Sequence, residues 1–292
     1  MSSFLKSINH YLSFVKFSHT VFAMPFALIG FFLALSAENR VFNLRLFLFI
    51  ILCMIFARNA AMGFNRLADR KIDALNPRTK NREIPSGIIS VKQATLFVII
   101  NSALFIVSAG MINRLTLILS PVALLIILGY SISKQVTSLC HFILGLGLSL
   151  APVGAYISVT GSFALLPVIY SLIVLTWVSG FDIIYALQDD DFDRANLIHS
   201  IPSSAGRKKA LAISLLIHCI TFILILLAGL VGKGAFFFWT GAALFSSLLF
   251  YQHFIVKHDN LSRINLAFGT TNGIASVLFA FFVILDLYFR YH

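Results

Sequence analysis

Charged side chains are scarce in this chain of 292 residues: only 11% are Asp, Glu, Lys or Arg, whereas 59% are hydrophobic. Its mean hydropathy of +0.93 exceeds what a soluble globular fold requires. Cysteine is also rare. Cys53, Cys140 and Cys219 stand alone inside apolar runs, a spacing that fits neither a disulfide framework nor a metal site. These shortages exclude the soluble and disulfide-stabilised classes and leave a membrane protein.

The apolar runs are continuous rather than alternating, which excludes a membrane β-barrel. About 20 helical residues cross ~30 Å of hydrocarbon. The runs therefore predict an all-α polytopic membrane protein with one domain covering residues 1–292 and nine transmembrane helices. We expect these helices at 17–37, 44–69, 93–113, 115–132, 138–159, 163–187, 209–231, 235–256 and 264–288. No A-x-A-like cleavage site follows the first run, so it is predicted to be a retained span.

The formal net charge of +11 would suggest nucleic-acid binding in a soluble protein, but the positive-inside rule explains it more simply here. Most Lys and Arg residues fall in loops on one side of the predicted bundle, which we assign to the cytoplasm. The N-terminus is then inside and the C-terminus outside. All acidic residues except Glu38 and Asp286 fall on or just inside the same side. That distribution favours chemistry with both anions and cations at the cytoplasmic face.

The stretch NRLADRKID, at the end of the second predicted helix, places Asn65, Asp69 and Asp73 four residues apart. On a helix each such step drifts by only about 40°, so the three oxygen-bearing side chains lie on one face. Several basic residues surround them. Carboxylates in a row among basic neighbours at a membrane surface suit Mg²⁺ holding an anionic phosphate group, although a lone Asp there is usually a solvated cap.

A second acidic stretch, FDIIYALQDDDFD, ends the sixth predicted helix. Asp189 and Asp193 are four residues apart, and Asp182 lies seven residues before Asp189. All three share a face if the helix continues, with Tyr185 beside them. Asp190 and Asp191 are expected to point elsewhere, solvated and balancing the basic run 207–209.

Two acidic motifs at the same membrane face imply more than one divalent ion. A diphosphate with Mg²⁺ is the natural ligand, because Mg²⁺ prefers one or two carboxylates together with phosphate oxygens and water. Arg58, Arg82 and Lys134 are candidates for neutralising the remaining charge. Arg58 lies two turns deeper than Asn65, where an ion pair with Asp182 is a structural alternative. For Lys134, a purely topological role is equally consistent with the sequence.

These motifs, with NPRTKNREIPSG, YSISK and APVGAYISVTG, resemble the signatures of the UbiA superfamily of intramembrane prenyltransferases, in its 4-hydroxybenzoate polyprenyltransferase-like branch. The resemblance covers most of residues 15–205. It implies a bundle around a central cavity and a Mg²⁺-bound polyprenyl diphosphate. It also implies metal ligation by Asn65, Asp69, Asp73, Asp189 and Asp193. Substrate-binding roles follow for Arg58, Asn65, Arg82 and Lys134, and catalytic positions for Asp182 and Tyr185. Relatives commonly have Gly near Leu197, so the turn there is expected to differ, and His199 receives no role.

The implied reaction transfers a polyprenyl group to a ring carbon of an aromatic acid in respiratory quinone biosynthesis. The acceptor alternatives are a 4-hydroxybenzoate for ubiquinone and a dihydroxynaphthoate for menaquinone. A transporter is a distant alternative, which predicts ionisable groups through the full membrane thickness. We expect a multi-pass protein of a bacterial-type inner membrane with its active site on the cytoplasmic side. The expected partners are the diphosphate, the aromatic acid and the lipid bilayer, with neither nucleic acid nor an obligate protein partner.

Overall fold

The computed structural model describes residues 11, 13–15, 22–38 and 40–291. The described part of the chain is helical apart from its turns and one isolated β-bridge between Lys257 and Asn260. Its elements in chain order are α2 (Met24–Ala37), α3 (Leu44–Leu75), α4 (Val91–Gly110), α5 (Arg114–Ser133), α6 (Cys140–Thr160), α7 (Leu165–Ala186), α8 (Asp190–Ala195), α9 (Ile201–Ala205), α10 (Arg207–Val231), α11 (Phe236–Ile255), η2 (Leu266–Thr271) and α12 (Asn272–Tyr291).

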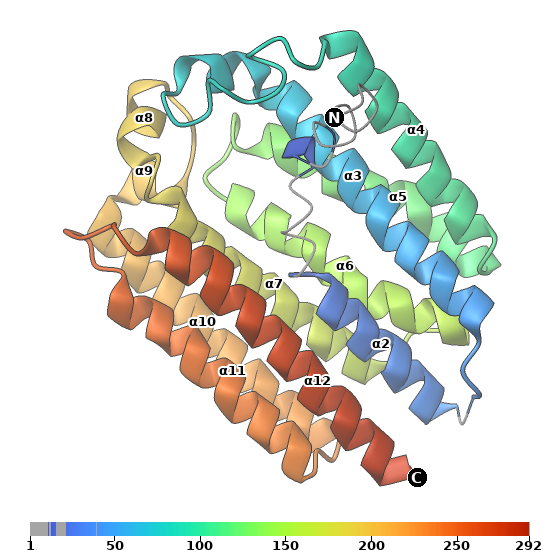
Figure 1. The fold of residues 1–292 in the computed structure, drawn as a ribbon. Coiled ribbons are helices and arrows are strands. Elements are labelled where there is room, and N and C mark those ends of the chain that lie inside the picture. The colour runs from blue at the N-terminus through green and yellow to red at the C-terminus, as the bar shows by residue number, and fades with distance from the viewer. Residues whose placement is uncertain (1–10, 12, 16–21, 39, 292) are drawn as a thin grey trace, which may run out of the picture.

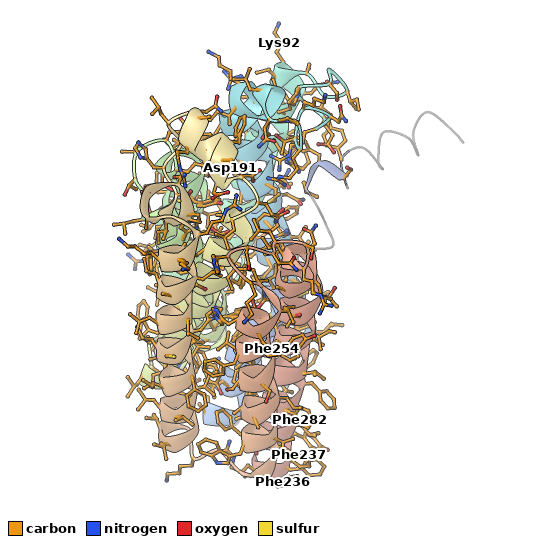
Figure 2. All side chains as sticks on the ribbon, turned by 90° about the vertical axis from the view of Figure 1, so that its left-hand side faces the viewer. Lys92, Asp191, Phe236, Phe237, Phe254 and Phe282 are labelled. Carbon is orange, nitrogen blue, oxygen red and sulfur yellow. The ribbon has the colours of Figure 1, made fainter. Side chains whose placement is uncertain are left out.

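The long helices lie side by side along one axis, and the connections at the two ends of the bundle differ (Figure 1). At one end, called here the motif end, lie the segment between α3 and α4 and the short helices α8 and α9. The opposite end carries the α2–α3 connection and the last turns of α12. Figure 2 shows Lys92 and Asp191 toward the motif end and Phe236 and Phe237 at the opposite end.

The predicted membrane class is confirmed in its coarser form. Seven helices are long and apolar enough to cross a membrane, and all of them belong to the part of the chain that is described. The apolar helix α2 has only 14 described residues, and the first five residues of the predicted first span, 17–21, lie outside the described ones. The helix α11 is not among the seven. The predicted count of nine spans therefore stays a prediction.

Aromatic packing joins distant parts of the chain. Trp177 of α7 is fully buried, and its ring centroid lies 5.4 Å from that of Phe26 in α2 and 5.5 Å from that of Phe245 in α11. Phe279 of α12 lies 5.1 Å from Phe245. Buried aromatic pairs contribute about 0.5–1.5 kcal/mol beyond their area. This cluster holds α2 against α7, α11 and α12.

Two helix ends matter for the site, and the first of them differs from its predicted position. The helix α3 continues six residues beyond the predicted end at Asp69, to Leu75, so the whole first motif lies on one regular helix. The helix α7 ends at Ala186, and Leu187, Gln188 and Asp189 follow in turns whose N–H groups bond three residues back. The predicted end of this helix at residue 187 is therefore confirmed to within one residue, and the continuation on which a shared face of Asp182, Asp189 and Asp193 depended does not occur.

Candidate active site

The first acidic motif forms ion pairs at the end of α3. Asp69 is almost fully buried and pairs with Nζ of Lys134, which lies just beyond α5. Asn65 donates its side-chain N–H to Oδ2 of Asp69 at 3.2 Å. One turn on, both carboxylate oxygens of Asp73 accept hydrogen bonds from Arg82, at 2.7 and 2.9 Å. The helical spacing thus places the three oxygen-bearing side chains together, as predicted.

A further buried pair of charges supports this motif. Arg66 and Glu83 are both buried, and each interacts electrostatically with the other. Oε1 of Glu83 accepts a hydrogen bond of 2.6 Å from Ser13. A buried ion requires a partner to offset its desolvation. Glu83 therefore ties the segment after α3 to the N-terminal part of the chain.

The Asn-Pro-Arg turn after α3 connects the two motifs. The side-chain oxygen of Asn76 accepts the N–H of Arg78 at 2.9 Å, and its amide donates to Oδ1 of Asp189 at 3.2 Å. Arg78 forms two hydrogen bonds with the carboxylate of Asp189, of which the one from Nε measures 2.9 Å. Arg78 also donates to the hydroxyl of Tyr185 at 3.4 Å. Residues more than 100 positions apart in the chain therefore form one charged cluster at the motif end.

The contacts within this cluster shift the pKa values of Arg78 and Asp193. Burial opposes the charge of Arg78, but the hydrogen bonds to Asp189 outweigh it and raise the pKa of Arg78 above its usual value. Burial, followed by the neighbouring carboxylate of Asp189, raises the pKa of Asp193 to about 6. Such a perturbed carboxyl group beside basic residues is typical of a functional site.

Asp189 and Asp193 remain one turn apart, because the N–H of Asp193 bonds to the carbonyl of Asp189 at 2.7 Å across α8. Asp190, expected to be solvated, is only 2% exposed and forms two hydrogen bonds of 2.8 Å with Arg207. That part of the expectation is wrong. The side chain of Asp191 is 83% exposed and also pairs with Arg207, so the balancing of the basic run is confirmed.

The structure assigns Asp182 a different partner from the Arg58 considered above. Nδ1 of His141 in α6 lies 2.7 Å from Oδ2 of Asp182, and Nε2 of the same ring accepts the backbone N–H of Ile201 at 3.3 Å. Because Nε2 accepts a hydrogen bond, Nδ1 carries the ring proton, and this N–H donates a hydrogen bond to Asp182. The role of His141 as the partner of Asp182 was not predicted from the sequence. Its signal in the sequence is weak, because a single His in an apolar helix is common.

The loop after α8 closes over the same region. The N–H of His199 bonds to the carbonyl of Lys134 at 2.9 Å, which joins this loop to the base that holds Asp69. Leu197 adopts φ of 55°, the left-handed conformation that Gly accepts most easily. The backbone at Leu197 therefore has a Gly-like conformation although the side chain is a leucine.

The basic residues proposed for substrate binding fall into two groups. Arg82 and Lys134 belong to the ion-paired cluster described above. Arg58 is half-buried on α3, seven residues before Asn65 and thus deeper in the bundle. Arg78 is one of the several basic residues that surround the first motif, and nothing in the spacing of the sequence indicates its link to Asp189.

The donor set fits Mg²⁺ shared with a phosphate ligand better than a cage of protein ligands. Oδ1 of Asp69 is buried and has no hydrogen-bond partner, which leaves an oxygen suited to a cation. Within the described residues, no group of three or more His, Cys, Asp and Glu side chains could hold a metal ion. Mg²⁺ at phosphate sites usually has only one or two carboxylate ligands. The metal roles of Asn65, Asp69, Asp73, Asp189 and Asp193 remain predictions.

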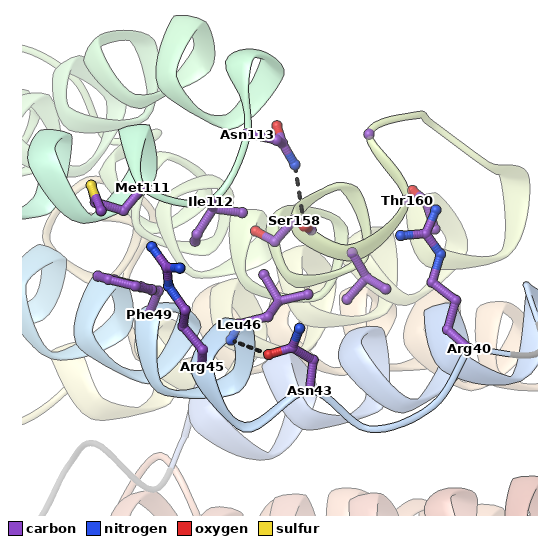
Figure 3. Close-up of a pocket in the computed structure, with 12 residues that line it drawn as sticks. Arg40, Asn43, Arg45, Leu46, Phe49, Met111, Ile112, Asn113, Ser158 and Thr160 are labelled. Carbon is purple, nitrogen blue, oxygen red and sulfur yellow. Dashed lines mark hydrogen bonds between the residues drawn. The ribbon is translucent and has the colours of Figure 1, made fainter.

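A cavity of about 390 Å³ lies at the opposite end of the bundle, away from this cluster. In Figure 3, Arg40, Asn43 and Arg45 border it on one side and Asn113 on the other. Arg40 pairs with Glu38, and the guanidinium of Arg45 lies 5.8 Å from the ring centre of Phe49. None of the predicted site residues lines this cavity.

The fold and the site together define an integral membrane helical bundle with a cluster of paired acidic and basic side chains at one end. Comparison with known proteins is more specific. The model of the UbiA prenyltransferase family matches residues 23–284. The chain is 31% identical over 232 residues to a 4-hydroxybenzoate octaprenyltransferase of Aliivibrio fischeri (strain ATCC 700601 / ES114), covering 78% of this chain and 80% of that protein. Over 231 residues it is 32% identical to the enzyme of that name from Nitrosomonas eutropha, covering 79% and 80%.

Solved structures agree with this family. The apo structure of a UbiA homolog from Aeropyrum pernix K1 has a TM-score of 0.82 at 31% identity and covers 92% of this chain and 98% of its own. A UbiA homolog from Archaeoglobus fulgidus, bound to DMAPP and Mg²⁺, has a TM-score of 0.76 at 20% identity, covering 95% and 99%, and therefore supports the fold alone. The chain belongs to the UbiA prenyltransferase family. It is an enzyme, a membrane prenyltransferase of the aromatic type.

Proposed function

We propose that this enzyme transfers a polyprenyl group from a polyprenyl diphosphate to a ring carbon of a 4-hydroxybenzoate-type aromatic acid, with Mg²⁺, in respiratory quinone biosynthesis. The observation that carries this proposal is the cluster joining Asp69 and Asp189. Lys134 pairs with the first and Arg78 with the second, and both bases lie at the motif end. Acidic residues paired with bases form a site for a dianionic ligand and its counter-ions.

In the proposed complex, Asp69, Asp73, Asp189 and Asp193, with Asn65, would hold Mg²⁺, which supplies positive charge to the diphosphate when bound. Each basic partner in the cluster is held next to a carboxylate. On binding, Arg78, Arg82 and Lys134 exchange part of these pairs for diphosphate oxygens. The leaving group is thereby stabilised as its charge develops, which is the term that most strongly lowers such barriers.

Asp182 and Tyr185 are proposed to act at the reacting carbons. The ring of Tyr185 lies 4.0 Å from that of Phe268, and the guanidinium of Arg78 lies 5.8 Å from its centre. An aromatic face of this kind stabilises a nearby carbocation. Asp182, oriented by the N–H of His141, would accept the proton that the aromatic ring loses after attack. Apolar walls keep water from the allylic cation.

The relatives named as 4-hydroxybenzoate octaprenyltransferases support 4-hydroxybenzoate as the acceptor, at about 30% identity. A dihydroxynaphthoate is the other acceptor that the same chemistry accommodates. The asymmetry of basic loops supports a motif end that faces the cytoplasm of a bacterial-type inner membrane. The bilayer would then supply the polyprenyl diphosphate from the side.

The deciding assay uses membranes that contain the protein, Mg²⁺, a polyprenyl diphosphate and either 4-hydroxybenzoate or 1,4-dihydroxy-2-naphthoate. We expect prenylated 4-hydroxybenzoate by mass spectrometry, and none after chelation of the metal. A product from the naphthoate alone would support the menaquinone alternative. Absence of product from both acids, with a folded protein, would refute the aromatic acceptor class.

A further inference from the structure

A second cationic cavity lies between α10 and α11, outside the candidate active site. Its volume is about 260 Å³. Both polar and apolar side chains line it: the polar ones are Lys208, His253, Lys257 and His258, and the apolar ones include Leu211 and Leu215. None of these residues belongs to the two acidic motifs.

The position of this cavity corresponds to a membrane surface. The helix α10 is the most apolar of the candidate spans, with a hydropathy of 2.8, and Lys208 is its second residue. The helix α11 ends at Ile255, two residues before Lys257. Both lysines therefore lie where the apolar surface of the helices gives way to the polar end. Below them on the outer surface, Leu215 is 40% and Phe254 is 74% exposed. Figure 2 shows Phe254 between Asp191 at the motif end and Phe236 and Phe237 at the other end.

The charge of the cavity is positive and uncompensated. Among the ion pairs of the described residues, none involves Lys208 or Lys257. Nζ of Lys257 lies 3.5 Å from the carbonyl of His253 and 5.4 Å from the ring centre of Phe254, which leaves its charge without a carboxylate. Asp259 is the acid next to Lys257 in the exposed turn, and it forms no ion pair with it.

We propose that this cavity binds the phosphate headgroup of an anionic glycerophospholipid, with one acyl chain lying along the exposed apolar side chains of α10 and α11. Basic pockets between membrane helices at a charged membrane surface bind such headgroups. A free phosphate ion would use the lysines but not the exposed apolar side chains on the same two helices. The combination of the two therefore favours a lipid.

The site also reaches the second acidic motif through one residue. Arg207 precedes Lys208 at the start of α10 and holds Asp190, the neighbour of Asp189. A lipid that fixes the start of α10 would therefore steady the motif. This last consequence rests on the proposed function, whereas lipid binding itself does not.

The binding test uses the full-length protein purified in detergent without substrates. Native mass spectrometry measures retained phosphatidylglycerol, phosphatidylcholine or inorganic phosphate for the parent and for Lys208→Ala with Lys257→Ala. Each lysine near a lipid surface changes affinity about fivefold, so we expect roughly 25-fold weaker phosphatidylglycerol binding in the double variant. The matched control is Lys209→Ala with Lys92→Ala, which removes the same charge from exposed positions outside the cavity. The arginine pair Lys208→Arg with Lys257→Arg should retain binding.

Equal loss in both double variants would mean a general charge effect and would overturn the site. If the parent protein retained phosphatidylcholine as well as phosphatidylglycerol, or bound inorganic phosphate but not the lipid, the proposed ligand would be wrong. A separate activity assay in nanodiscs compares phosphatidylglycerol with phosphatidylcholine. Lipid binding without any change in turnover would refute only the coupling to the acidic motif.

Discussion

In the first acidic motif, Asn65, Asp69 and Asp73 lie on successive turns of one 32-residue helix. In the second, the helix that carries Asp182 and Tyr185 ends at Ala186, and Asp189 and Asp193 belong to a turn and a helix of six residues. The backbone of α3 alone therefore orients the first motif. The second motif depends on contacts from other segments.

Those contacts come from three parts of the chain. Arg78 and Asn76, after α3, hold Asp189. The carbonyl of Lys134, after α5, holds the N–H of His199, and His141 of α6 connects Asp182 with Ile201. A site built on a rigid helix keeps its geometry when one contact is lost. A site held by loops is expected to lose more of its geometry when one contact is removed, so substitutions in the two motifs test this comparison.

The largest effect is expected from removing one carboxylate of each motif. Asp69→Ala and Asp189→Ala should each lower turnover on the order of 10²–10³-fold, because each removes a ligand of the same charged substrate complex. Product formation in membranes measures this, with size-exclusion chromatography in detergent as the test of folding. Asp191→Ala, at an exposed position, is the matched control and should keep its activity. Full activity of either motif variant would remove that motif from the proposed site.

Replacement of Arg78 tests the link between the motifs. Arg78→Ala should lower kcat/KM for the diphosphate by about 10- to 100-fold, since a charge-assisted hydrogen bond contributes about 1.5–3 kcal/mol. Arg78→Lys should recover part of this loss, because it keeps the charge but not the paired geometry. Steady-state kinetics with varied diphosphate measure both. If Arg78→Ala raised only the KM for the aromatic acid, the assignment of Arg78 to the diphosphate would be wrong.

The residues differ in how much of their role the sequence could predict. The spacing of Asn65, Asp69 and Asp73 is a local helical property, so their shared face was predictable. The end of α7 before Asp189 was also predicted to within one residue, but the separate six-residue helix that carries Asp193 was not, because no Gly or Pro between Ala186 and Asp193 marks its start. Likewise, the contacts of Arg78 with Asp189 and of His141 with Asp182 join residues far apart in the chain, and periodicity carries no information on such pairs.

A pH series tests the role of the second motif through the pKa of Asp193. Its folded-state pKa is raised to about 6, so acidification below pH 6 protonates this carboxyl group while an ordinary Asp is still ionised. Protons then compete with Mg²⁺ for the second motif. The Mg²⁺ concentration for half-maximal activity should rise, by up to about tenfold per pH unit below 6. Asp193→Asn should weaken Mg²⁺ binding and abolish this pH dependence. An unchanged Mg²⁺ requirement between pH 7 and pH 5 would contradict it.

The smallest expected effect concerns the backbone of the second motif. Leu197 is 84% exposed and has φ of 55°, so its side chain contributes little packing while its backbone is in a region that disfavours leucine. Leu197→Gly should relieve this conformation by about 1–2 kcal/mol, of which the greater flexibility of Gly in the unfolded chain cancels roughly half. Thermal unfolding in detergent should show a midpoint higher by roughly 1–2 °C. Lys233→Gly is the matched control, since Lys233 has φ of 51° in the turn between α10 and α11, at the end of the bundle away from the acidic motifs. A higher unfolding midpoint in both variants would mean that the left-handed backbone alone accounts for the effect. A lower midpoint only in Leu197→Gly would mean that the leucine side chain itself helps to hold the loop of the second motif.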